Sequence, residues 1–155
     1  MAETTIQFLD DGTEPVPSVK PDKARIGIIP VPLEKTVSYL AGTASAPARI
    51  LEASSQVELY DPELNSSPCR IGIHTYPSVD CSPPMEEVLH SLEKTVKDLA
   101  SNGKIPVCLG GEHTLTLAPV RALASLYPDL SVLCLDAHAD LRDTYQNDRL
   151  SQIGR

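Results

Sequence analysis

The segment Gly103-Lys-Ile-Pro-Val-Cys-Leu-Gly-Gly-Glu-His113 combines features that indicate an α/β fold. A helical pattern ends at Gly103, residues 105–109 form a short apolar run, and two glycines then lead into polar residues. Such runs, bounded by Pro, Gly or Asp, are typical of strands buried on both faces of a parallel sheet. The chain contains three more of them, at residues 25–29, 70–74 and 131–135.

A helix is predicted directly before this segment. Ser82 is the expected N-cap and Pro83 the first helical residue, where a missing N–H is tolerated, and Gly103 follows the last turn. The apolar side chains of this span recur with the helical period and share one face, which consists of Met85, Val88, Leu89, Leu92, Val96 and Leu99.

Two shorter helices complete the alternation of strands and helices. One covers residues 116–127, and the other begins near Ser45 and is expected to bury Ile50, Leu51 and Val57. This order of elements predicts a three-layer, doubly wound α/β fold with a mainly parallel sheet. Residues 1–23 are polar and contain prolines at three positions, so we expect an extended arm rather than a packed element.

The composition limits the classes of function. The 155 residues include 13 Lys+Arg and 21 Asp+Glu, which gives a formal net charge of −8. Such a chain gains no counterion release from nucleic acid and no attraction to anionic lipid, so both partners are disfavoured, whereas a small cationic substrate is compatible. The four cysteines form no C-x-x-C pair, and the first twenty residues lack a signal-peptide pattern. We therefore expect reduced thiols and a cytoplasmic protein.

Polar residues follow two of the predicted strands, at the edge where parallel α/β sheets bind ligands. Asp136, His138 and Asp140 recur with a period of two, so in an extended chain their side chains point to the same side. His113 follows the other strand and could add a fourth ligand. A divalent ion would satisfy these groups, and mixed carboxylate and imidazole ligands suit Mn²⁺ or another first-row ion better than Ca²⁺.

Each polar residue also has an ordinary structural interpretation. Asp136 could cap a turn, and Glu112 could orient the histidine that follows it or be solvated. Cys134 alternates with leucines in a predicted strand, which favours core packing. His74 is expected to be structural, and His90 to lie at the surface of a helix. The paired glycines match no phosphate-loop motif.

The two polar motifs together resemble those of the ureohydrolase family, which includes arginases and agmatinases. Gly110-Gly-Glu-His-Thr114 and Asp136-Ala-His-Ala-Asp-Leu-Arg142 are similar to the family's two first-half metal motifs. Residues 30–39 and 57–61 resemble the N-terminal pattern of agmatinases. The resemblance covers residues 25–151, and it implies that residues 24–155 are the N-terminal half of an arginase-like α/β domain, which would be an incomplete fold.

The resemblance implies an agmatinase-like amidinohydrolase, which converts agmatine and water to putrescine and urea with two Mn²⁺ ions. His113 and Asp140 would ligate one ion, His138 the other, and Asp136 would bridge them. Asp140 would also act in catalysis, by accepting a hydrogen bond from the attacking hydroxide. Arg142 stands where arginases usually have Asn, which favours a substrate without a carboxylate. The implied partner is a small cationic guanidino compound, and full-length relatives form homo-oligomers.

The length departs from the family pattern. Family members have about 300 residues, and their second half supplies two Asp ligands and an acidic residue for the guanidinium group. We therefore expect little or no hydrolysis from these 155 residues. Gln152 stands where the family has His, which suggests a truncated or frame-shifted reading frame, or a fragment. Sequencing of the encoding DNA beyond codon 151 tests this hypothesis.

Two other functions remain open at this point. The first is a non-catalytic α/β metal-binding or interaction module that packs against a partner chain. Its exposed sheet edge and uncovered apolar faces should then make the isolated chain associate. The second is a ureohydrolase for another guanidino compound, such as guanidinobutyrate or arginine.

Overall fold

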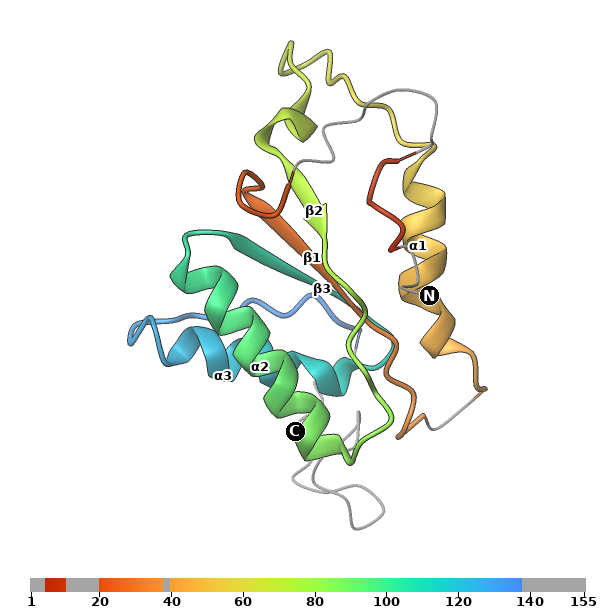
Figure 1. Cartoon of the computed structure of the whole chain (residues 1–155), viewed down its shortest axis with the longest axis vertical. Helices are drawn as coiled ribbons and strands as arrows, with labels where there is room; N and C mark the ends of the chain where they lie inside the picture. The colour runs from red at the N-terminus through yellow and green to blue at the C-terminus, as the bar shows by residue number, and fades with distance from the viewer. Residues whose placement is uncertain (1–4, 11–19, 38–39, 138–155) are drawn as a thin grey trace.

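A parallel three-stranded sheet lies between two layers of helices (Figure 1). The computed structural model describes residues 5–10, 20–37 and 40–137. The strands, in the spatial order β2-β1-β3, are β1 (Ile26–Val31), β2 (Ile73–Thr75) and β3 (Ile105–Gly110). One face of the sheet is covered by α1 (Ala46–Ser54), and the other by α2 (Met85–Ser101) and α3 (Leu117–Ala124). Short 3-10 helices span Thr43–Ser45, Pro68–Ile71 and His113–Thr116.

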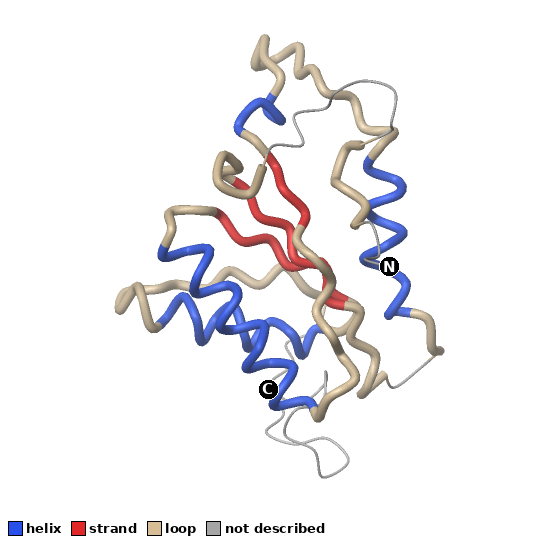
Figure 2. The backbone as a smooth tube through the Cα atoms, viewed as in Figure 1, coloured by secondary structure: helices blue, strands red, loops and turns tan. Residues whose placement is uncertain are grey.

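The central strand β1 runs parallel to both of its neighbours. Ile26 is opposite Ile73 of β2 and Ile105 of β3, and Val31 is opposite Gly110 at the end of β3. The carboxyl ends of the three strands therefore lie along the same edge of the sheet, as the traces in Figure 2 show. This arrangement confirms the predicted α/β class with helices on both faces of a parallel sheet.

The prediction of a fourth strand is wrong, because residues 131–135 do not form a strand. Leu133 and Leu135 are 83% and 90% exposed. A strand that is buried on both faces needs a hydrogen-bonded neighbour and covering helices. Within the part of the chain that the structure describes, this apolar run has neither.

The long helix α2 has the predicted apolar face but a later start. Its buried side chains are Val88, Leu89, Leu92, Val96, Leu99 and Ala100. The N-cap position is held by Pro84, so the assignment of Ser82 as N-cap and Pro83 as first helical residue is wrong. Each of those two residues precedes a proline, which disfavours the α conformation and delays the helix to Met85. Gly103 follows the helix with φ 73°, as expected for its end.

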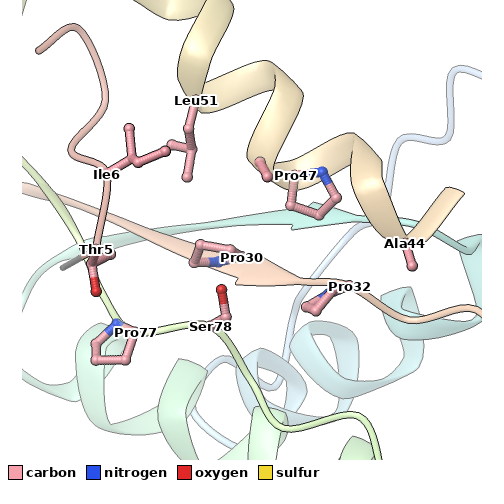
Figure 3. Close-up of a pocket in the computed structure, with 10 residues that line it drawn as sticks. Thr5, Ile6, Pro30, Pro32, Ala44, Pro47, Leu51, Pro77 and Ser78 are labelled. Carbon is pink, nitrogen blue, oxygen red and sulfur yellow. The ribbon is translucent and has the colours of Figure 1, made fainter. Parts of the chain in front are cut away.

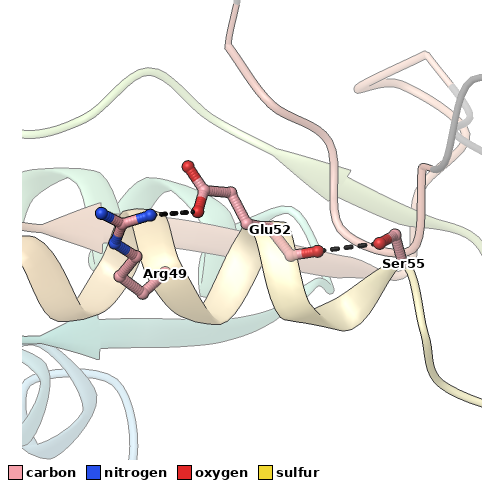
Figure 4. Close-up of polar contacts among 3 residues, drawn as sticks. All are labelled: Arg49, Glu52 and Ser55. Carbon is pink, nitrogen blue, oxygen red and sulfur yellow. Dashed lines mark hydrogen bonds and ion pairs between the residues drawn. The ribbon is translucent and has the colours of Figure 1, made fainter.

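The other two helices are shorter than their predicted patterns. In α1, Leu51 is buried, but Ile50 is 43% exposed, and Val57 lies beyond the helix with 54% exposure. The burial of these two residues was wrongly expected. On the solvent side of α1, Arg49 pairs with Glu52 at 2.9 Å, and the Ser55 hydroxyl donates to the Glu52 carbonyl (Figure 4). Such an exposed i,i+3 pair contributes only about 0.3 kcal/mol to the free energy of unfolding.

The main core lies between the sheet and the α2–α3 layer. Ile29 and Val31 of β1 point into it, and they pack with the apolar face of α2 and with Ala118 and Ala122 of α3. The small side chains of α3 allow its close approach to α2. Among the described residues, no helix is both long and apolar enough to cross a membrane.

The opposite face of β3 is poorly covered. Ile105 and Val107 are 47% and 36% exposed, and they alternate with residues that face the α2–α3 layer. With β1 on one side, β3 is an edge strand of the sheet that the structure describes. An exposed edge and uncovered apolar side chains were both expected, and both are present. The association of chains that should follow from them stays a prediction.

The described part of the N-terminal arm packs against the domain. The Gln7 side chain exchanges two hydrogen bonds with the Thr75 backbone, at 3.1 and 2.9 Å. The Leu9 amide donates to the Ser54 hydroxyl, and the Leu9 side chain is 7% exposed. For residues 5–10 the expectation of an unpacked arm is therefore wrong. Polar composition did not reveal that Gln7 can replace a strand as the partner of β2.

Cys108 gives a prediction about stability at high pH. It lies on the face of β3 that packs against the core, and burial raises the pKa of its thiol to about 11, from an ordinary value of 9.0. The folded state therefore holds this proton more tightly than the unfolded chain does. The resulting stabilisation is fully present below pH 9 and is lost as the pH rises toward 11, with a total of roughly 2 to 3 kcal/mol.

Urea denaturation across this pH range provides the measurement. The free energy of unfolding should fall more steeply with pH for the wild-type chain than for Cys108→Ala. Cys134→Ala, at an exposed position, is the matched control and should keep the wild-type slope. Equal slopes for the wild type and Cys108→Ala would contradict the burial of this thiol in the native state.

Candidate metal site

His113 and Asp136 meet at the carboxyl edge of the sheet. His113 begins the 3-10 helix that follows β3, and Asp136 follows the apolar run at residues 131–135. Nδ1 of His113 lies 3.2 Å from Oδ2 of Asp136, and the two side chains are 37% and 26% exposed. With metal–ligand bonds of about 2.1 Å, neighbouring ligand atoms are roughly 3 to 3.5 Å apart. The spacing and the donor types of this pair therefore fit a first-row divalent ion.

The glycine pair before His113 allows two loops to close on the end of β3. A Cβ atom at Gly111 would lie 2.3 Å from the Leu33 carbonyl oxygen and 3.0 Å from that of Thr43. A Cβ atom at Gly110 would overlap the Leu115 side chain. Glycine is needed at residue 111 because backbone atoms, which cannot rotate away, occupy the space of a side chain.

Glu112 anchors one of these loops. The residue is 3% exposed, and its carboxylate accepts hydrogen bonds from the amides of Lys35 and Thr36. The Thr36 hydroxyl also donates to it, at 2.6 Å. The interpretation of Glu112 as solvated is wrong, since its carboxylate joins the turn that carries His113 to the loop after β1. Sequence reasoning could not find this role, because the partners Lys35 and Thr36 are 77 and 76 residues away along the chain.

The rest of that loop is held by polar contacts of its own. Glu34 accepts hydrogen bonds from the amides of Ala44 and Gly42, which hold the pKa of its carboxyl below the ordinary value. The Lys35 ammonium donates to the carbonyl of Pro83, just before α2. Glu112 and Lys35 thus link three connections: the turn after β3, the loop after β1 and the entry to α2.

Cys134 also lies at this site, which sequence reasoning missed. Single donor atoms of His113, Cys134 and Asp136 all lie within 4.8 Å of one another. Cys134 is exposed, so the expectation that it packs in a core is wrong. The signal was present in the sequence, because Cys134 has the same period-two relation to Asp136 as the predicted ligands.

The remaining predicted site residues divide into two groups. His138 and Asp140 lie outside the described residues, so their assignment as ligands stays a prediction, and that of Asp140 as a catalytic residue does too. His74 and His90 are described. The His74 ring packs edge-on against Tyr76, with ring centroids 4.9 Å apart, and His90 is exposed on α2. Both positions agree with their structural interpretation.

A separate cavity of about 350 Å³ lies between α1 and the end of β1 (Figure 3). Prolines and aliphatic residues line most of it, including Pro30, Pro47 and Leu51. Its polar side chains are the hydroxyls of Thr5 and Ser78, so it offers no titratable or metal-binding group. Among the described residues, the candidate metal ligands His113 and Asp136 therefore lie outside this cavity.

Comparisons with known proteins show which proteins this chain resembles. The Arginase family model matches residues 24–153. The N(1)-aminopropylagmatine ureohydrolase of Synechocystis sp. is 36% identical over 134 residues, covering 79% of this chain and 42% of that protein. The agmatinase of Bacillus anthracis is 35% identical over 133 residues, covering 84% of this chain and 45% of that protein. The crystal structure of agmatine ureohydrolase from Thermoplasma volcanium superposes on this chain with a TM-score of 0.83 at 27% identity. The match covers 98% of this chain and 49% of that structure.

The chain spans about half the length of these relatives. Within that half, the family match includes β1, β3 and the sequence segments 110–114 and 136–142. The structural match extends over nearly the whole chain. These agreements of sequence and fold show that the chain belongs to the arginase family.

Proposed function

We propose that this chain binds Mn²⁺ through His113 and Asp136, together with His138 and Asp140, as part of a ureohydrolase for a cationic guanidino compound. The observation that carries the proposal is the 3.2 Å approach of the His113 imidazole to the Asp136 carboxylate. The two residues come from different loops, and the fold brings them to the edge where α/β sheets bind ligands.

Each of the proposed ligand residues has a distinct role in the proposed reaction. Bound manganese would supply an activated water close to the carbon of the guanidinium group. His113 offers an imidazole nitrogen donor, and Asp136 offers carboxylate oxygens whose negative charge would offset the charge of the ions. Asp140 is proposed to accept a hydrogen bond from the attacking water. The net charge of −8 favours the approach of a cationic substrate.

We infer that the substrate is agmatine, with N1-aminopropylagmatine as the second candidate. The second candidate rests on the relative from Synechocystis sp., which has this specificity in its name. Both compounds carry a guanidinium group and lack a carboxylate. Arg142 supports this choice, because its motif resembles agmatinases rather than arginases.

Titration with Mn²⁺, followed by the electron paramagnetic resonance signal of the free ion, tests the metal site. His113→Ala and Asp136→Ala should each weaken binding by at least about tenfold, because each removes a ligand. His90→Ala, which removes an exposed imidazole from α2, is the matched control and should bind as the wild type does. Unchanged binding in both ligand variants would refute the site.

Urea release tests the activity. We expect turnover of the 155-residue chain below about 1 s⁻¹, the lower end of ordinary enzyme rates, because the chain spans half the length of its relatives. The urea that is released should come from agmatine or N1-aminopropylagmatine in preference to arginine. Arginine as the best substrate would contradict the proposed specificity, while leaving the metal site intact.

A further inference from the structure

The thiol of Cys134 adds a third donor to the candidate metal site. Nitrogen, sulfur and oxygen atoms of His113, Cys134 and Asp136 lie within 4.8 Å of one another. In a tetrahedral site with bonds of about 2.0 Å to nitrogen and 2.3 Å to sulfur, these two atoms are roughly 3.5 Å apart. Side-chain movements of about 1 Å would therefore bring all three atoms to one ion.

We propose that His113, Cys134 and Asp136 form a zinc-binding site in which the Cys134 thiolate is a ligand. Thiolate donors select Zn²⁺ over Mn²⁺, and Zn²⁺ also has the higher affinity for most nitrogen and oxygen donors. The three residues leave one tetrahedral position for water or another group. Zinc at this site would occupy two of the proposed manganese ligands, so it would compete with manganese.

The sulfur of Cys134 is accessible to a metal ion. The residue is exposed, so an ion can reach the sulfur without any opening of the core. Cys108, in contrast, lies against the core, where burial raises the pKa of its thiol to about 11. Cys81 is partly buried, and Cys69 is buried. Among the described residues, Cys134 is the only one of the four cysteines that lies in a cluster of potential metal ligands.

Cobalt substitution tests the thiolate ligand directly. Co²⁺ should produce a near-ultraviolet thiolate-to-cobalt charge-transfer band, and added Zn²⁺ should abolish the band by displacing the cobalt. Cys134→Ser should lack the band and should bind Zn²⁺ at least about tenfold more weakly. Cys81→Ser is the matched control and should keep both properties. Far-UV circular dichroism will show that Cys134→Ser, a change at an exposed position, retains the fold.

Two results would overturn the inference. One is the absence of a charge-transfer band in the wild-type chain, and the other is a band that persists in Cys134→Ser. The competition with manganese rests on the proposed function, but thiolate coordination does not. If Mn²⁺ binds and Co²⁺ gives no band, the zinc site is wrong and the proposed function stands. If the cobalt band forms and Mn²⁺ fails to bind, the proposed function is wrong instead.

Discussion

Replacement of Gly111 by alanine should lower the free energy of unfolding by about 3 kcal/mol or more. The added Cβ would lie 2.3 Å from the Leu33 carbonyl oxygen and 3.0 Å from that of Thr43, so the backbone of two loops has to move. The same movement shifts His113, two residues further on, and should weaken the binding of Mn²⁺. Urea denaturation followed by far-UV circular dichroism measures the first effect, since the chain contains no tryptophan.

Gly103→Ala is the control for this substitution. Gly103 has φ 73°, and a Cβ there would have its nearest neighbour, an Arg25 nitrogen, at 3.7 Å. The change should therefore cost only the backbone strain of alanine in this conformation, about 1 kcal/mol. It should leave metal binding unchanged, because Gly103 lies at the opposite end of β3. Equal destabilisation by the two substitutions would show that the loops do not close on Gly111.

The sequence pattern correctly predicted the elements whose packing partners belong to the described part of the chain. The apolar face of α2 is visible in the sequence because its residues recur with the helical period, and five of the six predicted face residues are buried. The strands β1 and β3 were predicted from short apolar runs with proline or glycine beside them. The apolar faces of α2 and β1 and the Cys108 side of β3 contact partners that the described chain itself provides, whereas Ile105 and Val107 on the other face of β3 stay exposed.

The prediction failed where burial depends on a neighbour that the described residues do not provide. The run at residues 131–135 has the composition of a strand, but a strand exists only through hydrogen bonds to another strand. Val132, Leu133 and Leu135 are therefore exposed here. Cys134 was assigned to a core for the same reason, and the structure places it beside His113 and Asp136 instead.

The candidate site was predictable in part. A period of two and the expected positions of strand ends pointed to Asp136 and to His113, and these two residues do meet. The polar contacts that hold the arm and the loops in place were not predictable, because Gln7, Glu34 and Glu112 are polar residues without a distinctive pattern. Each acts through backbone groups, which carry no signature in the sequence.

Glu112→Ala should cost about 3 kcal/mol and release the loop after β1. The substitution removes one carboxylate that accepts three hydrogen bonds, from the amides of Lys35 and Thr36 and from the Thr36 hydroxyl. Loss of a buried acceptor costs about 1 to 3 kcal/mol, and more where the acceptor is charged. Hydrogen exchange provides the specific readout, because the amides of residues 35 and 36 should lose their protection.

Glu34→Ala is the matched control for this experiment. Glu34 also accepts hydrogen bonds from backbone amides of the same loop, at Gly42 and Ala44. Glu34 is only half-buried, so water can replace its carboxylate, and the loss of stability should be smaller than for Glu112→Ala. Glu112→Gln, which keeps one acceptor oxygen, should fall between the two. If the amides of residues 35 and 36 stay protected in Glu112→Ala, the buried carboxylate does not hold this loop against the turn that carries His113.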